Sequence, residues 1–258
     1  MGLENKTAVI TGGGRGIGAA VARALAEAGA SVVVASRTES DIEGVASALT
    51  ADCHRVWAVP CDVSDPKSIQ NLATAATEHL GHVDILVNNA GIALSAPIHK
   101  TTLDDWKSVL AVNATGVFLC IQAFLPGMVE REWGRVVNVA SVAGLTGMQY
   151  TAAYSASKHA VIGLTRCVAA EVAKKGVTVN AVCPGFVDTD MTVQTIDRIV
   201  EKTGVTQEDA LQGILGTTPQ HRLFQPDEVA HAVLSLCDEL AMGINGQAIV
   251  LDGGALLA

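Results

Sequence analysis

The stretch Thr11-Gly-Gly-Gly-Arg-Gly-Ile-Gly18 directly follows an apolar run at residues 7–11 and leads into an Ala-rich segment at 19–28. The run is typical of a buried strand, and the Ala-rich segment, ended by Gly29, is typical of a helix. Glycines between a strand and a helix N-terminus form a phosphate cradle, because backbone N–H groups point outward and missing side chains allow close approach. We predict a dinucleotide at Gly12, Gly16 and Gly18. A merely flexible turn is the alternative.

The same alternation continues along the chain and predicts one α/β domain, a doubly wound parallel sheet with helices on both faces. Its 258 residues, 49% of them hydrophobic, are enough for a substantial single core. The further predicted strands are 31–35, 55–59, 83–87, 134–140 and 247–251. The further predicted helices are 102–128, 193–202, 207–215 and 226–240.

The end of the second predicted strand bears on the choice of dinucleotide. An acidic residue there binds the adenosine ribose hydroxyls, whereas arginine accommodates a 2'-phosphate. The chain has Ser36 and Arg37 at this point, with Arg15 in the glycine loop as a second cation. We therefore predict NADP(H) rather than NAD(H), although Glu39 and Asp41 could partly neutralise Arg37. An ordinary solvated Arg37 is the alternative.

Polar residues follow the next two predicted strands. Asp62, beside Val63, could accept from the adenine amino group, or it could belong to the loop that starts the next helix at Ser64-Asp65-Pro66. Asn88-Asn89-Ala90-Gly91 lies beside the expected path of the cofactor. Asn113 interrupts an apolar helical pattern, which predicts a kink or a polar contact with the active site.

A possible catalytic group lies between residues 141 and 158. Ser141 follows a predicted strand, at the sheet edge where α/β proteins bind ligands. Tyr154 and Lys158 are four residues apart and so share one helix face. Because a phenol has a pKa of about 10, it needs a nearby cation to exchange protons, and Lys158 supplies one. With Ser141 bonded to the same oxygen, this set suits carbonyl reduction or alcohol oxidation. A surface helix pair is the alternative for Tyr154 and Lys158.

Composition disfavours several other functions. The net charge is -9 and no basic run occurs, so we expect neither a nucleic-acid partner nor binding to an anionic membrane. No signal-peptide core and no apolar stretch long enough to span a bilayer is expected, which makes cytoplasmic residence the default. The six cysteines lack metal-ligand spacing, so no metal is predicted.

Together these motifs resemble the short-chain dehydrogenase/reductase family over essentially the whole chain. The resemblance rests on the glycine loop, Asn88–Gly91, Asn113, Ser141, Tyr154-x-x-x-Lys158 and Pro184-Gly185-Phe-Val-Asp-Thr189. It implies a seven-stranded Rossmann fold, usually a homotetramer, and the catalytic set Asn113, Ser141, Tyr154 and Lys158. Tyr154 would be the general acid and Ser141 would orient the carbonyl. Lys158 would bind the nicotinamide ribose, and the backbone at Asn113 would hold a water.

The resemblance also implies the cofactor contacts. Besides Tyr154 and Lys158, the predicted contacts are Gly12, Arg15, Gly16, Ile17, Gly18, Ser36, Arg37, Asp62, Val63, Asn89, Ala90, Gly91, Pro184, Gly185, Val187 and Thr189. Val187 would meet the nicotinamide carboxamide through its backbone.

Residues 190–225, here called the lid segment, resemble the substrate lids of polyketide ketoreductases and 3-hydroxybutyrate dehydrogenases. Of the polar residues with which the latter hold a carboxylate, only Gln194 has a counterpart; Ala93, Ala143 and Thr151 stand at the other places. We therefore expect an uncharged pocket. Besides Ser141 and Gln194, its predicted residues are Leu94, Leu145, Met148, Tyr150, Phe186 and Met191, each of which could instead be a core residue.

The resulting prediction is an NADP(H)-dependent oxidoreductase that reversibly reduces a ketone, with 3-oxoacyl thioesters or polyketide-type ketones as the leading substrates. The first alternative is NAD-linked oxidation of a cyclic or aryl secondary alcohol. The alternative of another class is a dinucleotide sensor or scaffold without catalysis, against which the complete Asn-Ser-Tyr-Lys set argues.

Overall fold

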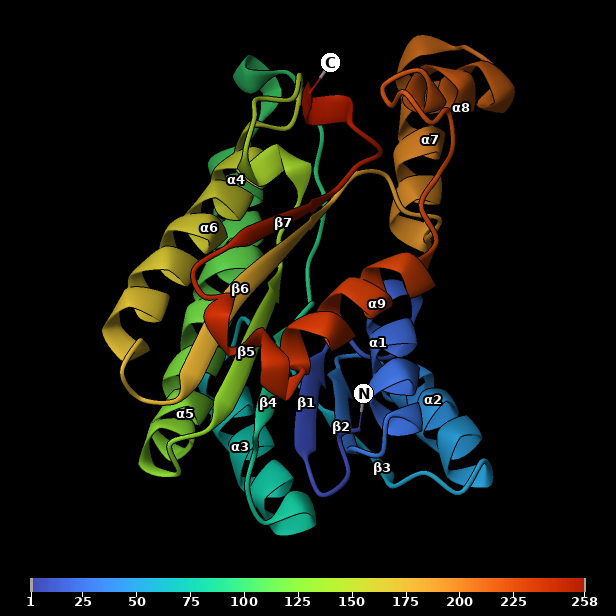
Figure 1. Ribbon diagram of the computed structural model, residues 1–258. Coiled ribbons are helices and arrows are strands. Elements are labelled where there is room, and N and C mark those ends of the chain that lie inside the picture. The colour runs from blue at the N-terminus through green and yellow to red at the C-terminus, as the bar shows by residue number, and fades with distance from the viewer. Residues whose placement is uncertain (1, 258) are drawn as a thin grey trace.

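The computed structural model describes residues 2–257, at whose centre lies a parallel seven-stranded sheet in the order β3-β2-β1-β4-β5-β6-β7 (Figure 1). The strand order reverses between β1 and β4, and ligands of such sheets bind beyond the strand ends at this point. This topology confirms the predicted doubly wound fold. The strands are β1 (Thr7–Thr11), β2 (Ser31–Ser36), β3 (Val56–Pro60), β4 (Ile85–Asn88), β5 (Gly134–Val139), β6 (Val177–Pro184) and β7 (Ala248–Leu251).

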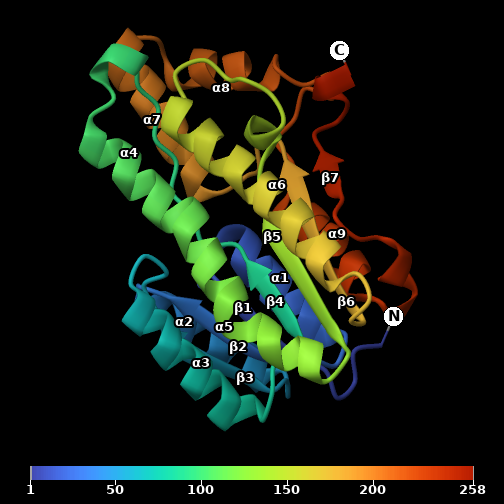
Figure 2. The same cartoon turned by 90° about the vertical axis from the view of Figure 1, so that its left-hand side faces the viewer.

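Helices cover both faces of the sheet (Figures 1 and 2). One face carries α1 (Gly16–Glu27), α2 (Glu39–Ala51) and α9 (Pro226–Cys237), and the other carries α3 (Pro66–Leu80), α5 (Gly116–Glu130) and α6 (Ala152–Val172). Every residue of β1, β5 and β6 is buried. Strands covered on both faces need continuous apolar runs, which is why the sequence pattern located them.

The long helix predicted at 102–128 is present but interrupted. It consists of α4 (Leu103–Leu110), a π-helical turn at Ala111–Thr115, and α5. Within this turn the backbone N–H of Gly116 donates to the carbonyl of Ala111, five residues earlier. Such turns accommodate one extra residue and often occur at functional sites. The sequence predicted a kink or a polar contact at Asn113, and the structure places this residue in a π turn that interrupts the regular helix.

The expectation of no apolar stretch long enough to cross a membrane is wrong by length and composition. The helical residues Leu103–Glu130 are long enough and apolar enough to cross a bilayer, with a mean hydropathy of 1.8. The physical reason is that α5 packs on the sheet through its apolar side chains, among them Cys120, Ile121 and Phe124. A core helix of a soluble protein has the same composition.

The lid segment contains α7 (Asp190–Thr203) and α8 (Gln207–Leu215), which stand beyond the C-terminal ends of the strands (Figure 1). Helix α7 begins three residues earlier than predicted, with an extended Thr189 before it and Asp190 in its first turn. An acidic residue there complements the helix dipole. Helix α9 ends at Cys237 rather than at 240, because Asp238 is extended and its side chain accepts from the N–H of Leu240.

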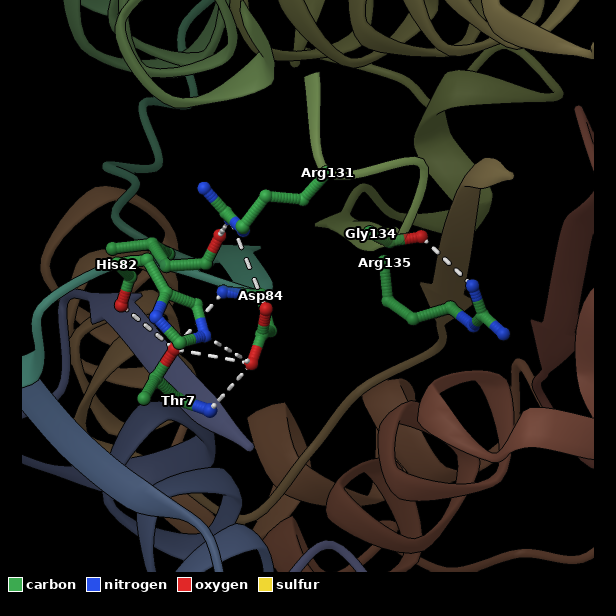
Figure 3. Close-up of polar contacts among 7 residues, drawn as sticks. Thr7, His82, Asp84, Arg131, Gly134 and Arg135 are labelled. Carbon is green, nitrogen blue, oxygen red and sulfur yellow. Dashed lines mark hydrogen bonds and ion pairs between the residues drawn. The ribbon is translucent and has the colours of Figure 1, made fainter. Parts of the chain in front are cut away.

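A polar cluster lies at the N-terminal ends of the strands, opposite the lid segment, and joins the start of β1 to the start of β4 (Figure 3). Asp84, only 5% exposed, accepts from the backbone N–H and hydroxyl of Thr7 at 3.2 and 3.3 Å. His82 lies 3.2 Å and Arg131 3.8 Å from the same carboxylate. Arg135 is fully buried nearby, donates to the carbonyl of Gly134, and has a pKa lowered chiefly by burial.

Candidate active site

The glycine-rich loop has a backbone that only small residues permit. Gly12 and Gly16 have φ angles of +65° and +52°, and a Cβ on Gly18 would overlap the carbonyl oxygen of Gly12. The side-chain amide of Asn89 donates to the carbonyls of Thr11 and Gly12, each at 3.0 Å. These bonds hold the loop against the end of β4, and its glycines leave the backbone accessible to a ligand.

The N-terminus of α1 fits a bound anion. The N-cap residue Arg15 makes no side-chain hydrogen bond to the first turn, and that turn contains no acidic residue. Its N–H groups and the positive end of the helix dipole therefore remain for a ligand. Combined with the close backbone approach at the loop, these features fit the pyrophosphate of a dinucleotide.

One cavity of about 550 Å³ runs from this loop to the lid segment, a volume typical of ligand sites. Every predicted cofactor contact lines it except Gly18. Gly18 is buried, and its missing side chain serves the close packing against Gly12 instead. The structure thus gathers residues from six separate segments of the chain, but the individual cofactor contacts stay predictions.

The end of the cavity predicted to hold the adenosine is lined by Ser36, Arg37 and Asp62. The hydroxyl of Ser36 donates to the carbonyl of Thr38 at 3.1 Å. Asp62 accepts hydrogen bonds from the backbone N–H and the hydroxyl of Ser64, at 2.9 and 2.7 Å. Burial alone would raise the pKa of Asp62, but these two bonds and the positive charge of Arg37 together lower it. The N-cap of α3 is Asp65, so Asp62 holds the preceding loop and also faces the cavity.

Ser141, Tyr154 and Lys158 lie together at the C-terminal edge of the sheet and line the same cavity. Ser141 follows β5 and accepts from the N–H of Ala143 at 3.1 Å. Lys158, 5% exposed, donates to the carbonyl of Val139 at 2.8 Å, and its Nζ lies 5.7 Å from the centre of the Tyr154 ring. The surface-pair alternative for Tyr154 and Lys158 is therefore wrong.

Burial dominates the protonation of this group. It raises the pKa of Tyr154, which a hydrogen bond with Ser141 partly opposes. Burial also lowers the pKa of Lys158 to about 8, against the opposing effect of Cys183. Lys158 was expected to lower the pKa of Tyr154, but in the protein without its cofactor burial raises that pKa instead. Tyr154 is a neutral phenol at pH 7 and holds the proton that an acid must give.

Asn113 is fully buried under the site and does not line the cavity. Its side chain exchanges hydrogen bonds with the backbone N–H and carbonyl of Ile92, both at 2.9 Å, and donates to the hydroxyl of Ser157 at 3.1 Å. Ser157 precedes Lys158 on α6. Asn113 thus connects the π turn, the segment after β4 and the helix that carries Tyr154 and Lys158.

The predicted substrate residues are only partly brought together. The residues that line the cavity are Leu94, Ser141, Met148, Phe186, Met191 and Gln194. Leu145 packs against the hydrophobic core instead. Tyr150 is 62% exposed, has a left-handed backbone with φ of +65°, and does not line the cavity.

The expectation of an uncharged pocket is also wrong, since Arg198 lines the cavity from α7. Arg198 was not among the residues predicted from the sequence. Helical spacing was the available signal, because Arg198 lies four residues after Gln194 and seven after Met191 and thus on their face.

The phosphate cradle and the proton-carrying side chains open into one cavity, which places this protein among the Rossmann-fold oxidoreductases. The sequence model for short chain dehydrogenase matches residues 6–199. The chain belongs to the short-chain dehydrogenase/reductase family. It is an enzyme, in agreement with the oxidoreductase, dehydrogenase and reductase names of its relatives.

Several relatives match over nearly their whole length. The 3-oxoacyl-(acyl-carrier-protein) reductase FabG of Vibrio cholerae is 39% identical over 98% of both chains. A D-beta-hydroxybutyrate dehydrogenase of Rhizobium meliloti is 37% identical, over 96% of this chain and 98% of its own. Among solved structures, a variant of actinorhodin polyketide ketoreductase with NADPH has a TM-score of 0.95 and 36% identity over 99% of both chains.

Proposed function

We propose that this enzyme reversibly reduces a ketone to a secondary alcohol with NADP(H). The observation that carries the proposal is the meeting of Ser141, Tyr154 and Lys158 in the cavity that also contains the phosphate cradle. Such an arrangement brings a carbonyl and a dinucleotide to one place, and holding reactants in position is a large part of catalysis. A non-catalytic sensor would have no need of this set.

Tyr154 is the proposed general acid of the reduction. When bound, the nicotinamide supplies the hydride. The neutral phenol of Tyr154 gives its proton to the carbonyl oxygen, while the hydroxyl of Ser141 donates a hydrogen bond to that oxygen and stabilises its developing charge. Lys158 donates to the nicotinamide ribose and places a positive charge near Tyr154. Asn113 keeps α6 in register with the segment after β4 through its hydrogen bonds to Ile92 and Ser157.

NADP(H) is the preferred dinucleotide in this proposal. At the end of β2 the cavity is lined by Ser36 and the exposed guanidinium of Arg37, and no acidic residue stands at the last strand position. Arginine matches phosphate geometry, so Arg37 is suited to a 2'-phosphate. A structural relative with NADPH supports the same choice.

The leading substrates are 3-oxoacyl thioesters or polyketide-type ketones, in line with the names of two similar proteins. NAD-linked oxidation of a cyclic or aryl secondary alcohol is the second candidate, since Leu94, Met148 and Phe186 give the cavity an apolar wall. From the family resemblance we also propose a cytoplasmic homotetramer with no nucleic-acid or membrane partner.

The deciding experiment is oxidation of NADPH in the presence of a short 3-oxoacyl thioester. In one parallel reaction NADH replaces NADPH. In another, an uncharged cyclic or aryl ketone replaces the thioester. Faster turnover with NADPH and the thioester supports the proposal. Turnover confined to NADH or to the simple ketone contradicts the cofactor or the substrate choice, respectively, and favours the second candidate.

A further inference from the structure

One face of α7 forms a wall of the substrate end of the cavity. Met191, Gln194, Thr195 and Arg198 all line it, at the spacing of successive helical turns. The hydroxyl of Thr195 donates to the carbonyl of Met191 and is thus used within the helix. The face therefore changes along its length from a thioether to an amide and then to a guanidinium.

Arg198 is half-buried, and its guanidinium has no ion pair or hydrogen bond among residues 2–257. The carboxylates of its own helix all have other partners: Asp190 pairs with Arg15, Asp197 accepts from Gln207, and Glu201 pairs with Lys202. A cation that faces a partly closed cavity without a counter-charge favours an anionic ligand.

The position of Arg198 points to the substrate rather than to the cofactor. The ion pair between Arg15 and Asp190 fixes the first turn of α7 beside the glycine-rich loop. Arg198 comes eight residues later, about 12 Å further along the helix axis at 1.5 Å per residue. Met191, at the near end of the same face, adjoins the Pro184–Thr189 segment predicted to contact the nicotinamide.

We propose that Arg198 is a specificity residue that binds an anionic oxygen group of the substrate, several bonds away from the ketone. Gln194, one turn before it, adds an amide donor to the same group. The inference rests on the proposed ketone reduction and narrows its substrate class. The anion is either the phosphate of a carrier thioester or a carboxylate at the far end of an oxo acid, and both meet a guanidinium through paired N–H donors.

The test compares charged substrates with uncharged counterparts that carry the same ketone. 6-Oxoheptanoate is paired with its methyl ester, and 3-oxobutanoyl coenzyme A with the uncharged N-acetylcysteamine thioester. In Arg198→Gln we expect kcat/KM for the charged member to fall about 10- to 100-fold, mainly through KM, as for the loss of a charge-assisted hydrogen bond. The neutral member should change by less than about twofold, since its binding uses no counter-charge.

Two further variants serve as controls. Arg198→Lys keeps the positive charge and should restore much of the loss. Lys202→Gln removes a charge from the same helix at an exposed residue that does not line the cavity, and should leave both members of each pair unchanged. A loss confined to the coenzyme A pair identifies a phosphate, and one confined to the oxo-acid pair identifies a carboxylate.

Equal losses for charged and neutral substrates, no loss for either, or a change only in the KM for NADPH would each overturn the role of Arg198. If the wild-type enzyme reduces none of these ketones, the proposed function fails instead. Calorimetric binding of butanoyl coenzyme A and of heptanoate to wild type and Arg198→Gln then decides the inference: weaker binding to the variant supports it, and equal or absent binding refutes it.

Discussion

Arg15 in the glycine-rich loop and Asp190 at the start of α7 form an ion pair, with 3.0 Å between Nη1 and Oδ2. The two residues lie 175 positions apart in the sequence. This pair joins the predicted cofactor loop to the lid segment. It also gives Asp190 as a partner to Arg15, one of the two cations predicted to bind a 2'-phosphate.

Asp190→Asn should therefore improve binding of NADPH relative to NADH, because Arg15 loses the carboxylate that competes for it. Both side chains are largely exposed, so the free energy of unfolding should change by less than about 1 kcal/mol. KM values for both dinucleotides give the measurement, with Asp197→Asn on the same helix as the control. An unchanged ratio of the two KM values would contradict the expected competition.

Cofactor preference should move toward NADH in a variant that combines Ser36→Asp with Arg37→Gln. The new carboxylate can accept from the ribose hydroxyls and repels a 2'-phosphate, while the guanidinium that attracts the phosphate is gone. The ratio of kcat/KM with NADPH to that with NADH measures the effect. If the ratio does not move, the 2'-phosphate is not bound at this place.

Tyr154→Phe should abolish turnover while NADPH still binds. The change removes one hydroxyl, which is the proposed proton donor, and leaves the ring beside Lys158. Loss of a general acid typically costs a factor of about 10² to 10⁴. Turnover and the dissociation constant for NADPH, from quenching of protein fluorescence, are measured together. Substantial remaining activity would refute the assignment of the acid.

The affinity for NADPH should weaken as the pH rises above about 8. Burial lowers the pKa of Lys158 to about 8, so the group is an ammonium below that pH and a neutral amine above it. Only the ammonium favours the dinucleotide electrostatically. Tyr154, with a raised pKa, stays neutral throughout this range. Dissociation constants between pH 7 and 9.5 test this, and Lys158→Met should give a flat profile in which binding is weak at every pH.

Asp84→Ala should lower the free energy of unfolding by about 2 kcal/mol, because the buried backbone N–H of Thr7 loses its acceptor, whereas the Thr7 hydroxyl still donates to the carbonyl of His82. Asp84→Asn keeps an oxygen at this position and should cost less. Urea unfolding of the three proteins measures the difference. Since the cluster lies at the edge of the sheet opposite the cavity, the KM for the ketone should stay constant.

The predictable parts of the molecule are those that local patterns determine. Buried strands need apolar runs and the phosphate cradle needs glycines, so β1, the loop and the Tyr154–Lys158 pair could be located from the sequence. Asn113 indicated an irregularity in the long helix, because asparagine is a poor helix former within an apolar segment, but the π turn itself was not predicted. These features depend on neighbours close in the chain.

The remaining features depend on contacts that spacing alone does not determine. Which face of α7 meets the cavity follows from how the lid segment packs over the site, although spacing relates Arg198 to Met191 and Gln194 once that face is known. Tyr150, which was expected to line the pocket, has a left-handed backbone and is largely exposed outside the cavity. The ion pair of Arg15 with Asp190 and the burial of Asp84 join distant segments, so no local pattern announces them.

The π turn at Ala111–Thr115 makes the length of this part of the chain a functional constraint. A deletion in an ordinary helix rotates everything beyond it by about 100°, at 3.6 residues per turn. The π turn already contains one residue more than a regular turn, so deleting one residue here would give a regular helix in which α4 and α5 keep nearly the same relative orientation. Asn113 would nevertheless lose the position from which it bonds Ile92 and Ser157, so such a deletion would spare the packing of α4 and disturb the catalytic centre.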